Sequence, residues 1–252
     1  MIDLHSHVLP GLDDGAADLD AAVAMARAAR EDGVSVLAAT PHVRDDYRTT
    51  PEQMEQALAQ VRAAVADAGV QVEILPGGEI ALDELARLEP DELRRFGLGG
   101  NPNVLLLEFP YYGLRLDIAQ RLFDLRTSGF TPVLAHPERN PVVWKDTSVV
   151  ADFVAAGALV QITAASLDGR LGRRARASAL ELIDLGLAHM VASDAHAPEV
   201  RAIGMTAAAE AVGDRSLARW LTHEVPRAVL DGRALPARPQ TQPQRRRRFG
   251  FL

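Results

Sequence analysis

Short apolar runs alternate with longer amphipathic stretches along most of the chain. Each short run is typical of a buried strand, and we expect seven of them: Ile2–His5, Val34–Thr40, Val70–Pro76, Asn103–Glu108, Thr131–Ala135, Ala158–Thr163 and His189–Ser193. The longer stretches predict helices at Asp18–Glu31, Pro51–Ala68, Leu82–Phe96, Leu116–Ser128, Val149–Ala156, Gly172–Leu185, Arg201–Val212 and Ser216–Leu230. Such regular alternation of strand and helix indicates an α/β protein with a parallel sheet.

The connections between these elements predict one domain over residues 1–236. Several helices end at a glycine just before the next strand, and no linker-like gap separates the units. Seven strand–helix units of this kind favour a closed or nearly closed (β/α) barrel. An open, doubly wound sheet is the alternative, because periodicity alone does not establish closure.

The last segment, ARPQTQPQRRRRFGFL, has a different composition from the rest. Residues 237–252 are rich in Pro, Gln and Arg and contain no acidic residue, which is typical of a disordered extension. A solvated tail is the simpler interpretation, and contact with an acidic partner or a membrane surface is the alternative.

Composition excludes several classes of protein. The net charge of −7 falls mainly on the part before this basic tail, which argues against a nucleic-acid-binding surface there. No cysteine is present, so disulfides, thiolate metal sites and cysteine nucleophiles are excluded. No apolar run reaches the roughly 20 residues that span a bilayer, and the first residues lack the pattern of a secretion signal. We therefore expect a cytoplasmic location and no transmembrane segment.

Metal-binding residue types gather where the predicted strands end. Nine of them follow the strands or lie in the loop after the first one: His5, His7, Asp14, His42, Glu79, Glu108, His136, Asp194 and His196. In a barrel the carboxyl ends of the strands share one mouth, so these side chains converge. Five imidazoles and four carboxylates suit Mn, Fe, Zn or Mg. Nine ligands are too many for one ion, so two or three ions are expected, and three would favour an anionic substrate such as a phosphate ester.

Two arginines lie close to these residues in sequence. Arg139 follows His136 by three positions and Arg201 follows His196 by five. A guanidinium group binds phosphate oxygens in a bidentate manner, although a surface ion pair is the alternative for each. Neighbouring Asp13 and Glu138 are expected either to support the ligands or to have no role. We expect His189 and His223 to be structural.

The motifs resemble a known family. The segments MIDLHSHVLPGLDDG, TPH, GGEI, LLEF, AHPERN and ASDAH are similar to those of bacterial tyrosine-protein phosphatases of the polymerase-and-histidinol-phosphatase (PHP) superfamily, in the branch associated with capsule and exopolysaccharide synthesis. The resemblance runs from Met1 to about Leu230. It implies a distorted seven-stranded barrel that holds a trinuclear, usually manganese-dependent, centre.

The resemblance also implies a role for each motif residue. His5, His7, Glu79 and Asp194 would hold one ion; Glu79, Glu108 and His136 a second; Asp14, His42 and His196 a third. Arg139 resembles the phosphate-binding arginine of the family, and Arg201 is a looser match. The segment Val225–Leu230 resembles the closing region of the family, but Glu224 stands where asparagine is more usual.

These observations lead us to expect a phosphatase that removes phosphate from tyrosine on a partner protein, such as the tyrosine kinase that controls capsule synthesis. A phosphatase for histidinol phosphate or a sugar phosphate would use the same site. An amidohydrolase would often bridge its metals with a strand-end lysine, whereas the only lysine, Lys145, lies in a predicted loop. A non-catalytic binding module would have lost ligands, and none is missing.

Overall fold

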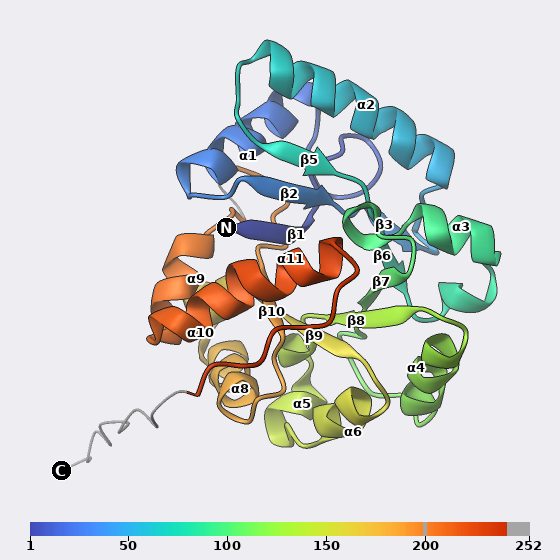
Figure 1. The fold of residues 1–252 in the computed structure, drawn as a ribbon. Coiled ribbons are helices and arrows are strands. Elements are labelled where there is room, and N and C mark those ends of the chain that lie inside the picture. The colour runs from blue at the N-terminus through green and yellow to red at the C-terminus, as the bar shows by residue number, and fades with distance from the viewer. Residues whose placement is uncertain (199–200, 241–252) are drawn as a thin grey trace.

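The strands form two sheets in the computed structural model, which describes residues 1–198 and 201–240 (Figure 1). The smaller sheet is parallel and has the order β1 (Ile2–Ser6), β2 (Val36–Ala39), β5 (Glu73–Leu75). The larger sheet has the order β10 (Met190–Ala192), β9 (Leu159–Thr163), β8 (Thr131–Ala135), β7 (Val104–Glu108), β6 (Glu79–Ala81), β3 (His42–Arg44), β4 (Tyr47–Arg48). Only the β3–β4 pair is antiparallel among these described strands. The predicted α/β class is confirmed.

Two of the predicted strands are interrupted, and this is why a single continuous sheet is not observed. The predicted strand 34–40 stops at Thr40, and after Pro41 the chain continues as β3 in the other sheet. The predicted strand 70–76 stops before Gly77 and Gly78 and continues as β6. Proline lacks the amide hydrogen that a sheet requires. Gly78 packs so closely that an added Cβ would lie 2.6 Å from the ring of Phe96.

The two sheets meet again at the carboxyl end of β1. Ser6 forms an isolated parallel bridge with Ala195, just beyond β10. The amide of His7 donates to the carbonyl of Ala195 at 2.8 Å, and the amide of Asp194 donates to the carbonyl of His5 at 2.9 Å. The first and last strands therefore lie beside each other where both carry predicted site residues.

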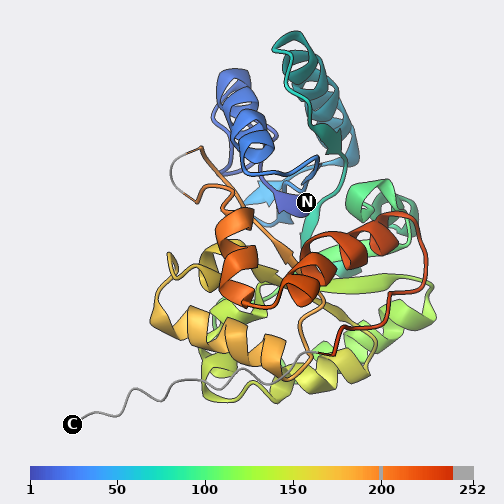
Figure 2. The same ribbon diagram turned by 60° about the vertical axis from the view of Figure 1, so that its left-hand side comes forward.

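Helices cover the outer faces of both sheets. The helices are α1 (Leu19–Glu31), α2 (Pro51–Asp67), α3 (Pro90–Arg95), α4 (Ile118–Thr127), α5 (Pro141–Lys145), α6 (Val149–Ala155), α7 (Ala164–Leu167), α8 (Arg173–Asp184), α9 (Met205–Val212), α10 (Arg215–Arg219) and α11 (Val225–Leu230). Helices α1 and α2 lie over the smaller sheet, and α4, α5, α6 and α8 lie around the larger one (Figures 1 and 2). The start of α2 was predictable, since Thr50 precedes Pro51 as a cap, and Thr50 and Gln53 form a capping box in the structure.

Two predicted helices are divided, each near a proline. The stretch Leu82–Phe96 contains a short 3-10 turn and then α3, which begins at Pro90. The stretch Ser216–Leu230 contains α10, a π-helical turn at Trp220–Glu224, and α11. Pro226 cannot donate a helical hydrogen bond, so the helix is wider just before it.

The segment that follows α11 packs against the rest of the protein. The indole of Trp220 donates to the carbonyl of Pro236 at 3.0 Å. Arg238 donates to the carbonyl of Ile183 at 2.6 Å, so the described chain still contacts the rest of the protein two residues after the predicted boundary at residue 236. The rest of the predicted tail, residues 241–252, lies outside the described residues. Within the described part of the chain, no helix is long and apolar enough to cross a membrane.

Candidate metal centre

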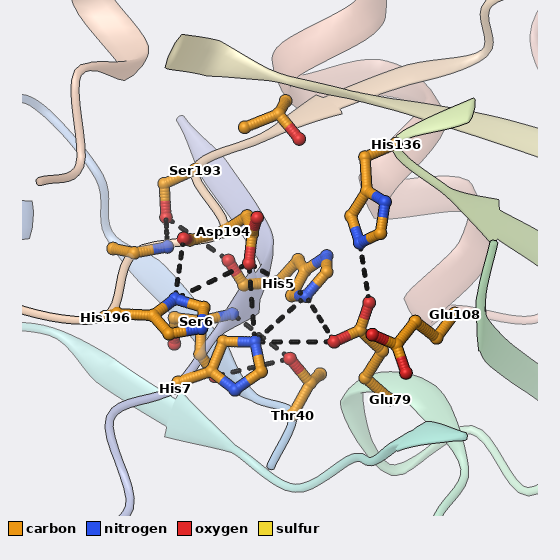
Figure 3. A network of polar contacts seen from close by, with 12 residues as sticks. His5, Ser6, His7, Thr40, Glu79, Glu108, His136, Ser193, Asp194 and His196 are labelled. Atoms are coloured by element: carbon orange, nitrogen blue, oxygen red, sulfur yellow. Dashed lines mark hydrogen bonds and ion pairs between the residues drawn. The ribbon is translucent and has the colours of Figure 1, made fainter. Parts of the chain in front are cut away.

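The predicted ligands converge where β1, β7, β8 and β10 end and where β3 and β6 begin. Figure 3 labels all of them except Asp14 and His42. All nine lie in four overlapping groups in which the ligand atoms are within 4.8 Å of one another. Eight of the nine are buried, and only Asp14, at 44% side-chain exposure, faces solvent. The structure therefore brings all nine of the predicted residues together.

The backbone is strained at this centre. His136, Asp194 and Arg201 have φ angles of 41°, 53° and 55°, and they are the non-glycine residues with positive φ in the described chain. This conformation is unfavourable for residues with a side chain and persists only where the surroundings enforce it. All three are residues that the sequence analysis assigned to the site.

The first group joins His5 of β1, His7 just after it, and Asp194 in the loop after β10. The Nε2 atoms of His5 and His7 are 3.2 Å apart. Each lies 3.4 Å from Oδ1 of Asp194. Three potential ligand atoms thus face one small volume.

Glu79 lies between this group and the next one. Its Oε1 is 2.8 Å from Nε2 of His136, and its Oε2 is 3.3 Å from Nε2 of His5 and 2.9 Å from Nδ1 of His42. Glu108 lies on the far side, with Oε1 4.0 Å from the same Nδ1 of His42. Because its two oxygens face different histidines, Glu79 is placed to bridge two ions.

A third group lies closest to solvent. Oδ1 of Asp14 is 3.5 Å from Nε2 of His42 and 3.4 Å from Nε2 of His196. His7 belongs to this group as well as to the first. The four groups therefore form one continuous cluster.

The cluster fits metal ions because its ligand atoms lack other partners. Oε2 of Glu79, Oδ1 of Asp194 and Nε2 of His196 are buried and make no hydrogen bond. Leaving buried polar atoms unpaired is costly. All three point into the spaces between the ligands, where cations would satisfy them. Oxygen and nitrogen ligands without sulfur suit Mn, Fe, Zn or Mg.

The electrostatics of the cluster favour the charged form of two carboxylates, Glu79 and Asp194, whereas burial raises the pKa of Glu108. Burial alone would raise the pKa of Glu79 and Asp194, but the neighbouring histidines, His5 first, hold both well below their ordinary values. Burial likewise opposes charge on His5, yet Glu79 and Asp194 raise its pKa. Burial lowers the pKa of His136 to about 4. A neutral imidazole is the form that binds a metal.

The Nδ1 atoms of His5 and His7 are held by two side chains for which the sequence predicts no definite role. Nδ1 of His5 is 2.8 Å from Oε1 of Gln161, and Nδ1 of His7 is 2.7 Å from Oδ2 of Asp13. The same Oδ2 accepts the amide of His42 at 2.9 Å. Such contacts fix which nitrogen of an imidazole faces the metal. Gln161 was detectable as a polar residue inside the apolar run LVQIT.

Both predicted arginines reach the cluster. Arg139 and Arg201 donate to Oδ2 of Asp194 at 2.5 and 2.8 Å. Their side chains are 16% and 28% exposed, so each guanidinium lies at the rim of the buried cluster. A third arginine, Arg44, was not predicted, and it donates to Oε1 of Glu108 at 2.8 Å.

The remaining candidates lie elsewhere. Glu138 is buried beside the site, where it accepts the amide of Thr163 and the hydroxyl of Ser166. His189 accepts the amide of Val160 at the other end of the sheet, and His223 lies in the π-helical turn. Lys145 is exposed at the end of α5, so the cluster contains no bridging lysine.

Comparison with known proteins agrees with this geometry. Residues 1–230 match the family described as capsular polysaccharide synthesis, CpsB/CapC. The chain belongs to the CpsB/CapC family. It is 35% identical to tyrosine-protein phosphatase YwqE of Bacillus subtilis (strain 168) over 261 residues, which cover 100% of both chains. It is 28% identical to tyrosine-protein phosphatase CpsB of Streptococcus pneumoniae over 204 residues, or 78% of this chain and 83% of that one.

A solved structure of this family has the same fold. It comes from a study of YwqE from Bacillus subtilis and CpsB from Streptococcus pneumoniae, described as unique metal-dependent tyrosine phosphatases. It superposes with a TM-score of 0.86 at 32% identity and covers 96% of this chain and 100% of that one. The family predicted from the motifs is confirmed.

Proposed function

We propose that this chain is a metal-dependent tyrosine-protein phosphatase that hydrolyses phosphotyrosine on a partner protein. The observation that carries the proposal is the buried cluster of nine ligands with two arginines at its rim. The relative YwqE, named as a tyrosine-protein phosphatase, supports it, since it matches this chain over its full length. The absence of cysteine excludes a cysteine phosphoenzyme.

The cluster would hold two or three divalent ions, and manganese is the ion that we propose. His5, His7, Asp194 and Glu79 would hold one ion. Glu79, Glu108 and His136 would hold a second, and Asp14, His42 and His196 a third. The ligand groups support the third set directly, and they place Glu79 with His136 in one group and with Glu108 in another. Bound ions of this kind acidify a water molecule and neutralise charge on a phosphate ester.

The side chains of the chain itself would bind and orient the substrate. Arg139 and Arg201 each keep N–H groups beyond those that contact Asp194, and these would bind phosphate oxygens. Asp13 and Gln161 would keep His7 and His5 in the orientation that the metals require. Because a phenolate leaves with a pKa near 10, strong protonation of the leaving group is less necessary than for an alkoxide.

Two finer proposals follow from the fold and the family. The bridge between Ser6 and Ala195 and the continuation of β2 into β3 and β5 into β6 support a distorted seven-stranded barrel of the PHP type. The match to a capsular polysaccharide synthesis family supports a bacterial tyrosine kinase as the partner, in the cytoplasm.

The test compares substrates on metal-stripped and reloaded protein. Chelator-treated protein should contain no metal by elemental analysis and should not hydrolyse a phosphotyrosine peptide. Manganese should restore activity better than magnesium. His5→Ala and Asp194→Ala should lose several orders of magnitude in rate. Full activity in metal-free protein would refute the proposal. Faster turnover of histidinol phosphate than of the peptide would replace it with the small-molecule alternative.

A further inference from the structure

Two of the three tyrosines of the chain stack on histidines of the metal cluster. The ring of Tyr111 lies 5.5 Å from that of His136 at an interplanar angle of 17°. The ring of Tyr47 lies 5.8 Å from that of His42, also at 17°. The two tyrosines come from separate segments, the loop after β7 and the β3–β4 hairpin.

Each tyrosine also contacts an arginine at the rim. The guanidinium of Arg139 lies 5.1 Å from the ring centre of Tyr111, and that of Arg44 lies 5.2 Å from the ring centre of Tyr47. The same arrangement of histidine, tyrosine and arginine therefore occurs twice. The two copies are joined through Glu79, whose two oxygens face His136 and His42 respectively.

These rings are not explained by the packing of the core. Both are half-buried at the mouth of the cluster. Among the described residues, neither hydroxyl has a hydrogen-bond partner. A buried structural tyrosine usually has such a partner. The two rings therefore offer aromatic surface beside the cluster, Tyr111 next to the proposed phosphate-binding Arg139 and Tyr47 next to Arg44.

We propose that Tyr111 and Tyr47 are specificity-determining residues, which select phosphate esters of an aromatic alcohol by contacting the ring of the substrate. This inference rests on the proposed function and names its substrate class. When a phosphate is held at the cluster by Arg139, the group attached to it extends toward the mouth and meets these side chains. A phenyl ring gains aromatic contacts there, whereas a short alkyl group does not.

Binding of two phosphonates to the manganese-loaded full chain tests this inference without any turnover. Phenylphosphonate and methylphosphonate share the anionic group and differ in the ring. The wild type should bind phenylphosphonate more tightly in calorimetric titration. Tyr111→Leu should weaken the binding of phenylphosphonate by about 5- to 20-fold. It should leave the affinity for methylphosphonate within about twofold of the wild type. Tyr47→Leu should act in the same direction, and Tyr111→Phe should retain the preference.

The matched control is Tyr112→Leu, because Tyr112 is 86% exposed and makes no ring contact with a histidine of the cluster. Its phosphonate affinities should equal those of the wild type. Metal content and melting temperature establish that each variant is folded and loaded. If Tyr111→Leu does not fold, Tyr47→Leu decides the matter alone.

Two results would overturn the inference. One is equal weakening of both phosphonates, which would mean that the tyrosines act only by holding Arg139 or His136. The other is no preference for the phenyl group in the wild type. A wild type that prefers phenylphosphonate but does not hydrolyse phosphotyrosine would contradict the proposed function and leave aromatic recognition standing.

Discussion

Nδ1 of His7 lies 2.7 Å from Oδ2 of Asp13, so a proposed metal ligand is held by a carboxylate six residues further along the chain. Each of the two groups shifts the pKa of the other. Although burial favours its neutral form, His7 lowers the pKa of Asp13 to about 2. Asp13 in turn helps to raise the pKa of His7 against the effect of burial. With Asp13 on one ring nitrogen, the other nitrogen of His7 is directed at Asp194 and Glu79.

Replacing this carboxylate should weaken metal binding without removing a ligand. Asp13→Asn should lower manganese affinity or phosphatase activity by about 10- to 100-fold, the usual range for a residue that orients a metal ligand. Metal titration and kcat measured on the same samples check this. Asp20→Asn, in the exposed first turn of α1, is the control and should change neither. Unchanged metal affinity and activity in Asp13→Asn would show that His7 needs no support.

Arg139 should contribute to the reaction separately from the metals. In Arg139→Ala the nine ligands remain, so metal content should match the wild type. Activity should fall by roughly 30- to 1000-fold, because losing one donor to the reacting group costs about 2–4 kcal/mol. Elemental analysis beside kcat/KM on a phosphotyrosine peptide measures both effects.

Arg174→Ala provides the control for this variant, since Arg174 is exposed on α8 and contacts only the ring of Trp144 among the described residues. Near-normal turnover in Arg139→Ala with all metals bound would remove it from the phosphate site. Loss of metal would instead show that its contact with Asp194 is needed to hold the ligands.

The strand–helix order was readable from the hydrophobic pattern because the longer strands, such as β1 and β7, are buried along their whole length. The two strand interruptions could not be predicted from this pattern. Pro41 and the pair Gly77–Gly78 are local signals, but their consequence, a transfer of the chain from one sheet to the other, depends on Phe96 and other distant residues packing there. Periodicity within a window carries no information about such contacts.

The ligands were predictable for a related reason. Parallel strands bring their ends together, so polar residues at those ends could be expected to meet. Gln161 and Tyr111 were missed because each acts on a histidine from another segment, and only the tertiary structure brings them within contact. Asp13 was recognised only as a neighbour of Asp14, since the position of a residue in a loop does not show where its side chain points.

Glu138 should make stability depend on pH. Burial raises the pKa of its carboxyl from 4.5 to about 7, although Ser166 and the amide of Thr163 donate to it. The folded protein therefore binds this proton more tightly than the unfolded chain between these values. The free energy of unfolding should fall as pH rises from 4.5 to 7, by an amount on the order of 3 kcal/mol from this group.

Urea unfolding of metal-free Glu138→Gln and wild type from pH 5 to pH 8 measures this effect. The variant should have the shallower decline, because its amide does not titrate. Asp3, whose pKa burial raises to about 6, titrates in both proteins and cancels from the comparison. Identical slopes would mean that Glu138 keeps its ordinary pKa in the folded protein.

Truncation at two positions should separate the packed end of the chain from the part beyond it. Arg238 donates to the carbonyl of Ile183 at 2.6 Å, and its guanidinium lies 5.6 Å from the ring centre of Trp220. Losing these contacts should cost about 1 kcal/mol, or roughly 2–4 °C in melting temperature. Arg238→Ala and deletion of residues 237–252 should both show this loss. Deletion of 241–252 should not, because the composition of that segment predicts a solvated extension.

Arg233→Ala, whose side chain is 66% exposed, serves as the control and should melt like the wild type. Phosphatase activity should be unchanged in all four proteins, since Arg238 and Arg233 make their contacts away from the metal cluster and the family match ends at residue 230. If deletion of 237–252 leaves the melting temperature unchanged, the contacts of Arg238 do not stabilise the fold, and the folded domain ends at residue 236 as the composition predicts.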